Sequence, residues 1–355
     1  MRDVRELRAA GAGALVVASY MLLVLSTGRV QLYDFARLLG FYLRTSLSLW
    51  LFLGLSLLII ELYRNRPRAG SGPNPVAVTL AAARSRWERD RFASLFWPPL
   101  LFATMMASFN AFKQMVLPLA GFGLDPAFAQ ADKLLFLGQD PWRVSHALFG
   151  SPQATLLIDR AYHGWFVPMS LGVMLCAWLA ASTYRLRNQY LLSYIGVWIG
   201  IGSIAAFLLP SAGPCYYEHF TGPYPSFAAL EQHLLSAEAA TGAKLTALSN
   251  QAGLLKLFGG ESLAVGAGIS AMPSVHNALA VLFAIAGWKV RRTLGVLFGA
   301  YAALIWIGSI HLGWHYAIDG LLAAAMTAVI WVAAGRVVER LERGSGQVQP
   351  EAALA

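Results

Sequence analysis

One short stretch near the carboxyl end, "HLGWHYAID" (residues 311–319), combines residue types that can bind a metal or move protons. His311, His315 and Asp319 follow one another at intervals of four, so a helix would carry all three on one face. Ionisable groups are costly in apolar helices, and they mark functional sites there by default. Three interpretations fit the spacing: a metal site, a buried polar cluster and a catalytic device.

A second stretch, "AMPSVHNALA" (271–280), offers groups that suit a phosphate ester. Pro273 and Ser274 are residue types favoured at the start of a helix. The free N–H groups and the positive dipole end of such a helix form a ready phosphate site. His276 would lie in the first turn, close enough to donate a proton to an ester oxygen of that phosphate.

His315 and Asp319 together suit nucleophilic catalysis. A carboxylate one helical turn away can accept a hydrogen bond from one ring nitrogen, which fixes the tautomer and leaves the other nitrogen free to attack. With His276 as the acid, the set would perform phosphoryl transfer through a phosphohistidine, without a metal or another cofactor.

A zinc site is the competing interpretation. His311 and His315 at i and i+4 are a common ligand pair, and Asp319 and His276 would complete the coordination. Against zinc, the Pro-Ser before His276 would then have no role, and no Glu lies between the two histidines to act as a base.

The composition predicts that membrane helices position these groups. Of the 355 residues, 57% are hydrophobic and only 13% are charged, whereas soluble domains carry about 25% charged residues. Apolar run length therefore predicts an all-α fold, a polytopic membrane helix bundle of about eight spans. The expected spans are 11–28, 46–62, 95–120, 157–183, 190–210, 275–288, 293–310 and 313–334.

Basic residues predict the orientation of the bundle. The net charge of +9 is expected in the cytoplasmic loops of a membrane protein, and nucleic acid is a poor alternative partner. About two thirds of the 27 Lys and Arg residues fall on one side if the N-terminus is inside. We therefore expect both termini in the cytoplasm and His276 and His315 near the outer interface, on neighbouring helices. A cleaved signal peptide in place of the first span would leave the remaining topology unchanged.

The loops complete the expected organisation. A segment as long as 211–272, on the outer face, is typical of a lid or binding element. The amphipathic segment 124–150 is too polar to span and is expected as an interfacial helix. The predicted domains are 1–62, N-terminal membrane helices; 63–94, a basic cytoplasmic linker; 95–335, a catalytic membrane domain; and 336–355, a disordered tail.

"PSVH" followed by "HYAID" resembles the type 2 phosphatidic acid phosphatase superfamily, whose members share P-S-x-H and a later H-x-x-x-D. The resemblance covers mainly residues 190–334. It implies that His315 is the phosphoryl-accepting nucleophile, Asp319 its partner and His276 the general acid, and that Ser274 helps to hold the phosphate. It also implies a six-helix phosphatase-like core, to which this chain adds N-terminal helices.

Cations of the usual phosphatase pattern are missing here. Lys113 is followed by no Arg-Pro, and the place of an Arg six residues before the later His is taken by Ser309. "ADKLLFLGQDPW" (131–142), "PSAGPCYY" (210–217) and "HLGWHYAID" are similar to the inositol phosphorylceramide synthase branch, the aureobasidin-resistance group, and its bacterial relatives. In that branch a lipid hydroxyl replaces water in resolving the phosphohistidine.

The resemblance implies membrane lipids as substrates, a glycerophospholipid donor and a ceramide or other lipid alcohol as acceptor. The implied location is a bacterial inner membrane, with the active site at the periplasmic face. One alternative is a lipid phosphate or polyprenyl pyrophosphate phosphatase, with water as the acceptor. Another class is a non-catalytic lipid binder or transporter.

A further set of residues is expected to bind the phosphate or the headgroup. Each cation also fits a snorkelling interface residue, each aromatic residue fits an interfacial belt, and the histidine fits a hydrogen bond to a neighbour. The candidates are the cations Lys113, Lys133, Arg143 and Arg160, the aromatic residues Tyr216, Tyr217 and Trp314, and His311.

Overall fold

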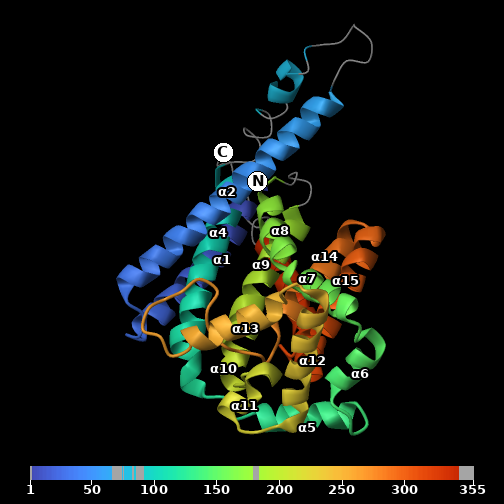
Figure 1. Ribbon diagram of the computed structural model, residues 1–355. Helices are drawn as coiled ribbons and strands as arrows, with labels where there is room; N and C mark the ends of the chain where they lie inside the picture. Colours follow the sequence, from blue (N-terminus) through green and yellow to red (C-terminus); the bar gives the residue numbers. More distant parts are fainter. Residues whose placement is uncertain are drawn as a thin grey trace, which may run out of the picture.

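The computed structural model describes residues 2–65, 74, 76–81, 84, 92–178 and 184–343, and the regular elements in these residues are all helical (Figure 1). Six helices are long and apolar enough to cross a membrane. This confirms the predicted fold class, an all-α polytopic bundle, and it fits an integral membrane protein. The six are α1 (Arg2–Ser26), α2 (Leu32–Arg64), α4 (Phe92–Ala111) with η1 (Phe112–Val116) and η2 (Leu117–Ala120), α9 (Tyr184–Gly196) with η4 (Val197–Ala205) and α10 (Ala206–Leu208), α15 (Arg292–His311) and α16 (Ala317–Arg343).

Two shorter helices complete the apolar bundle, α8 (Phe166–Trp178) and α14 (Val275–Val290). The N and C labels lie at one end of the bundle and α5 and α11 at the other (Figure 1). At the end with the termini, Arg185 at the start of α9 lies 3.5 Å from Glu339 and 3.1 Å from Glu342 near the end of α16. The start of α9 and the end of α16 therefore share one side of the bundle, and the assignment of that side to the cytoplasm stays a prediction.

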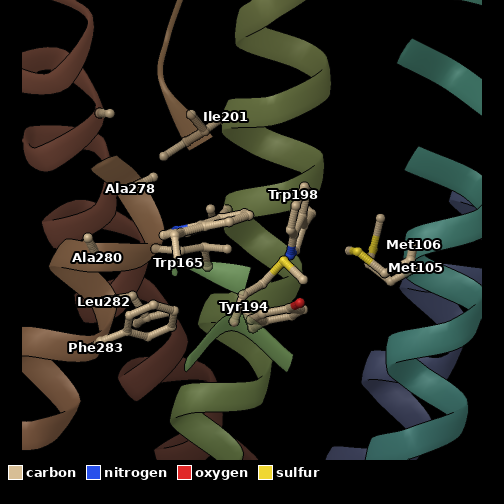
Figure 2. Close-up of a cluster of buried hydrophobic side chains, with 14 of the residues drawn as sticks. Met105, Met106, Trp165, Tyr194, Trp198, Ile201, Ala278, Ala280, Leu282 and Phe283 are labelled. Carbon is tan, nitrogen blue, oxygen red and sulfur yellow. The ribbon is translucent and has the colours of Figure 1, made fainter. Parts of the chain in front are cut away.

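The core lies where α4, α8, η4 and α14 meet. Trp165 and Trp198 fill its centre, and Met105 and Met106 approach them from α4 (Figure 2). All four side chains are buried. Phe109 meets Trp198 edge-on, with ring centroids 4.6 Å apart. Aromatic side chains of this size dominate the burial of apolar surface, so this contact region sets the relative positions of the four helices.

The run predicted as one span at 157–183 contains a helix break. α7 (Pro152–His163) ends at Gly164, and α8 begins two residues later at Phe166. The polar residues of α7 explain the difference, because the carboxylate of Asp159 is buried and accepts hydrogen bonds from the N–H groups that begin another helix. Residues 179–183 lie outside the described part of the chain.

The predicted interfacial helix at 124–150 is also two helices, α5 (Asp125–Leu135) and α6 (Pro141–Phe149). Between them Leu137 and Gly138 have φ values of 54° and 89°. A left-handed backbone ends a right-handed helix, and Pro141 is suited to start the next.

The long segment 211–272 is largely helical. It contains α11 (Tyr217–Phe220), α12 (Pro225–Thr241) and α13 (Thr246–Leu257). α12 ends at Gly242, whose φ of 65° is left-handed, and α13 then lies across the bundle (Figure 1) and packs against α7. The segment is therefore a structured cover on the bundle, and its role as a lid or binding element stays a prediction.

Three predicted boundaries differ at the two ends of the chain. α1 and α2 begin earlier than the spans expected at 11–28 and 46–62, since run length locates only the apolar middle of a helix. The disordered tail expected at 336–355 is wrong for its first eight residues, because α16 continues to Arg343 and its acidic residues pair with Arg185. Residues 344–355 and most of the predicted linker at 63–94 lie outside the described part.

Candidate active site

The stretch 311–319 is not one helix. His311 is the last residue of α15, and Gly313, with a φ of 75°, ends the helix in a left-handed turn. The N–H groups of Trp314 and His315 both donate to the carbonyl of Ser309, at 2.9 and 3.1 Å, and α16 begins at Ala317. The expectation that His311, His315 and Asp319 share one helical face is therefore wrong. The glycine in the middle of the stretch is the physical reason.

His315 and Asp319 nevertheless meet across this turn. The Nδ1 of His315 donates to the Ala271 carbonyl at 2.9 Å and to Oδ2 of Asp319 at 3.2 Å. The same carboxylate oxygen accepts from the N–H of Tyr316 at 3.2 Å. Both side chains are buried. Because both partners of Nδ1 are acceptors, the proton sits on Nδ1 and the lone pair is on Nε2.

α14 starts at the second motif. The Oγ of Ser274 accepts from the backbone N–H of Asn277 at 3.3 Å and from its side-chain amide at 2.9 Å. The same amide approaches Oγ of Ser309 at 3.4 Å. Asn277 thus bridges the start of α14 to the end of α15, at the position where the phosphatase pattern has an arginine. The sequence analysis missed Asn277, although a polar amide one residue after His276 in an apolar helix was a usable signal.

His276 is held by aromatic rings. Its ring centroid lies 4.2 Å from that of Trp165 and 5.1 Å from that of Tyr162, with the Tyr162 ring nearly parallel. On another side, the ring centroids of His276 and His315 are 5.9 Å apart. The structure therefore brings together His276 of α14 and His315 of the turn before α16, at a separation that leaves each within reach of one shared phosphorus atom.

A cavity of about 610 Å³ opens beside His276. Its walls come from α2, α4, η1, α7, α8, η4, α13 and the segment before α14, and they are mainly aromatic and aliphatic. Lys113 is the only Asp, Glu, Lys or Arg among the described residues that line it. Trp314 lines it as well, so of the weaker sequence candidates these two lie near the histidines.

Buried carboxylates from α5 fix the turn that carries His315. Asp132 accepts from the N–H groups of Ala317 and Ile318, at 2.7 and 2.9 Å, and so caps the start of α16. Asp125 accepts from the hydroxyl of Tyr316 at 2.8 Å. The pKa of Asp132 is raised to about 7, mainly by burial; the hydrogen bonds from the two N–H groups oppose this shift, and the nearby charges of Asp319 and Asp140 add to it.

The remaining aspartate of this kind lies on α7. The carboxylate of Asp159 accepts from the N–H groups of Thr246 and Ala247, at 2.8 and 2.9 Å, and caps the start of α13. His163 also lies 3.2 Å from Asp159. Burial raises the pKa of Asp159, but its hydrogen bonds outweigh burial, and the net pKa lies below the usual value.

The structure places His311 away from the cavity. Its Nδ1 is 3.2 Å from Oγ of Ser145 and its Nε2 is 3.0 Å from Oγ1 of Thr155. Its ring is also stacked on that of His146, with centroids 3.8 Å apart, and it is fully buried. Both ring nitrogens of His311 are therefore engaged with other parts of the protein.

The other candidates lie outside the cavity lining. Lys133 and Arg143 each lie 3.9 Å from a carboxylate oxygen of Asp140, and Arg160 is exposed on α7. The hydroxyl of Tyr216 donates to the carbonyl of Gln251, and Tyr217 packs against aromatic residues of the outer segment. None of the five lines the cavity.

The sequence model of a family described as the PAP2 superfamily matches residues 126–333, which is more than half of the chain. The chain belongs to the PAP2 superfamily. The match spans both histidine motifs and ends within α16. Members of the superfamily are typically phosphatases that act on lipid phosphates, so lipid phosphatase or phosphotransferase chemistry is indicated. No curated protein and no solved structure matches the chain.

The PAP2 match starts in α5, so α1, α2, α4 and η1 lie before it. Within the described residues, no group of three or more His, Cys, Asp or Glu side chains is placed to hold a metal ion. The two donors of the predicted zinc pair, His311 and His315, lie on either side of the Gly313 turn. Metal independence stays a prediction that a chelator would test.

Proposed function

We propose that the protein is a membrane phosphotransferase that moves a phospho-headgroup from a glycerophospholipid to a ceramide or another lipid hydroxyl, as inositol phosphorylceramide synthases do. The observation that carries the proposal is the pair of facing histidines, 5.9 Å apart between ring centroids, with Nδ1 of His315 held by Asp319. One ring has a free nitrogen lone pair, and the other lines a cavity large enough for part of a lipid.

In the first step Nε2 of His315 attacks the phosphorus of the donor. The new N–P bond forms as the P–O bond to diacylglycerol breaks, and His276 gives a proton to the departing oxygen. Positive charge then develops on the His315 ring, where the Asp319 carboxylate stabilises it. In the second step the acceptor hydroxyl loses its proton to His276 and attacks the phosphorus. Its new P–O bond replaces the N–P bond, and both histidines return to their starting state.

Charge supports a diester donor. Lys113 is the single formal cation among the described cavity residues, and Ser309 stands where the phosphatase pattern has an arginine. A phosphomonoester carries close to two negative charges at neutral pH, whereas a phosphodiester carries one. Lys113 is the only permanent cation in the described cavity lining, so a monoester with two negative charges is less completely neutralised than a diester with one. The water-accepting phosphatase is the second candidate, favoured by family membership alone.

Reconstituted protein tests the proposal with a phospholipid that is radiolabelled at phosphorus and a fluorescent short-chain ceramide. We expect a product that carries both labels, and none with His315→Ala. Brief incubation with the donor alone is expected to label the wild-type protein through a bond that is labile to acid and stable to base, as a phosphoramidate is. A melting temperature for each variant separates loss of chemistry from loss of fold.

The two alternatives give different results. Release of inorganic phosphate from phosphatidic acid, independent of ceramide, would identify a phosphatase. Lipid binding with no product from either substrate class would identify a binder or transporter. Full turnover by His315→Ala would remove the nucleophile from the scheme, and activity that is lost with a strong chelator and restored by zinc would replace it with a metal mechanism.

A further inference from the structure

Much of the cavity wall comes from outside the family match. Tyr42 and Thr45 of α2, Phe109 and Asn110 of α4 and Lys113 of η1 all line the cavity, and all precede residue 126. The hydroxyl of Tyr42 donates to the side chain of Asn110 at 2.9 Å, which ties α2 to α4. These helices therefore do more than surround the family core, because they close one side of the space beside His276.

Asn110 also fixes the segment that leads into α14. Its amide donates to the carbonyl of Ala264 at 2.9 Å and its oxygen accepts from the N–H of Gly266 at 2.6 Å. Gln114 makes a matching pair of bonds to Ala264, at 2.7 and 3.1 Å. The segment before the Ser274 cap is thus held on the N-terminal helices, which couples their position to that of His276.

Lys113 lies in a π-helical turn, η1, which contacts the segment before α14 at Gly268. π-turns insert an extra residue into a helix and occur frequently at functional sites. The Cγ of Lys113 lies so close to Gly268 that a Cβ there would be 2.8 Å away, so its stem packs under the backbone of the segment. A cation in an apolar wall is costly without an anionic partner, and no carboxylate lines this cavity within the described residues.

Three neighbouring side chains have polar hydrogens to donate. Tyr162, Trp165 and Trp314 line the cavity, and the hydroxyl or indole N–H of each is buried with no hydrogen-bond partner in the described protein. Leaving a buried donor unpaired is unfavourable. Each of the three groups can donate, and Lys113 is the cation of the cavity wall, so a ligand with an acceptor or a negative charge suits these residues.

The size and lining of the remaining space suit a hydrocarbon chain. At roughly 30 Å³ for each group of water size, the 610 Å³ holds about twenty such groups, the content of one long chain with a small polar end. Phe41 and Phe166 line the cavity and are exposed by 40% and 54%. The cavity therefore reaches the apolar surface at α2 and α8, where a chain enters from lipid.

We infer that this cavity binds one hydrocarbon chain of an anionic phospholipid along α2, α4 and α8, with the phosphate of that lipid held by Lys113. The inference rests on the proposed function for the role of the phosphate, and it adds that helices outside the family match select the lipid. Lys113 contacts the negative charge, and the α2 wall, including Thr45, limits the chain.

Quenching of tryptophan fluorescence by brominated acyl chains measures occupancy directly, because Trp165, Trp198 and Trp314 line the cavity. The probes are phosphatidylglycerol and diacylglycerol with the same brominated chains, titrated into the full-length protein without an acceptor. We expect Lys113→Met to weaken phosphatidylglycerol quenching about ten- to a hundredfold, the loss of one charged hydrogen bond. Diacylglycerol quenching is expected to stay unchanged, and Lys113→Arg to restore most of the lost affinity.

Matched variants serve as controls for the lysine and for the hydrocarbon-chain site. Lys133→Met removes a lysine that pairs with Asp140 away from the cavity, and no change is expected. Thr45→Phe is expected to weaken both lipids by at least tenfold by filling the chain site. Ser48→Phe, three residues along α2 at an exposed position, should leave both affinities as in the wild type.

Equal binding of both lipids by the wild type, Lys113→Met and Thr45→Phe would overturn the inference. Because quenching needs no turnover, the two proposals fail separately. If the variants change quenching as expected but no transfer product forms, the phosphotransferase proposal is refuted and the binding site stands. Transfer activity in the wild type, with Lys113→Met normal in both the transfer assay and the quenching titration, would refute the binding site and leave the phosphotransferase.

Discussion

Replacement of Asp319 by Asn tests how the nucleophile is supported. The Asp319 carboxylate lies 3.2 Å from Nδ1 of His315, and both groups are buried. When the N–P bond forms, the ring becomes cationic. A charge pair about 4 Å apart is worth about 4 kcal/mol at an effective dielectric constant of 20. At about 1.4 kcal/mol for each factor of ten, Asp319→Asn should lower kcat by about a thousandfold.

The orientation of the ring should survive this change. The Ala271 carbonyl also accepts from Nδ1 of His315, at 2.9 Å, so the tautomer remains fixed. We therefore expect KM to change by less than threefold while kcat falls, because the lost interaction exists mainly in the transition state. This separates Asp319 from a residue that only holds the fold.

Turnover of a labelled phospholipid, measured over a range of acceptor concentrations, gives both constants. Asp34→Asn, a buried aspartate on α2 that lies beside Arg37, is the matched control and should retain normal kcat. A decrease in kcat of less than tenfold for a folded Asp319→Asn protein would refute the reasoning, as would a decrease confined to KM.

Three further predictions concern pH, the helix break and His311. Burial raises the pKa of Asp132 from 3.8 to about 7 in the folded protein, so the fold should lose stability as pH rises from about 4 through 7, and Asp132→Asn should flatten the pH dependence of the melting temperature in detergent. Gly313→Ala places a side chain at a φ of 75°, which should cost about 1–2 kcal/mol and lower the melting temperature by a few degrees, whereas Gly11→Ala at an exposed position of α1 should not. His311→Ala removes the hydrogen-bond partner of the Thr155 hydroxyl and one of the two partners of the Ser145 hydroxyl, so thermal denaturation should show a loss of about 2–3 kcal/mol, while the KM of the folded fraction stays normal. A normal melting temperature with a raised KM would instead make His311 a substrate contact.

The sequence predicted the fold class and most of the helices because apolar run length reports directly on burial in lipid. It also predicted the two histidine motifs as one site, since charge bias alone puts His276 and His315 at the same end of neighbouring helices. The structure agrees with that juxtaposition, and the roles of the residues await the experiments above. Local patterns were informative here because each motif begins a helix.

Contacts between segments far apart in the sequence could not be predicted from local sequence patterns. Asp125 and Asp132 looked like ordinary polar residues of an interfacial helix, yet they bind groups 191 and 185 residues away in sequence. Lys113 could not be ranked above Lys133 or Arg143, because all three were outer-facing cations by topology. Only the packing of α2 and α4 against the core places one of them in the cavity and the other two beside Asp140.

The long-range carboxylate contacts have a consequence for how activity begins. Asp132 of α5 is synthesised 185 residues before Ala317, which it caps, so this contact forms only after the start of α16 has been made. Contacts of such high sequence separation form late in folding. A nascent or truncated chain that lacks α16 therefore has His276 and His315 without Asp319, and under the proposed mechanism its nucleophile would be unsupported. If the lipids of the bilayer are the substrates, as proposed, the order of synthesis delays activity until the last helix is in place.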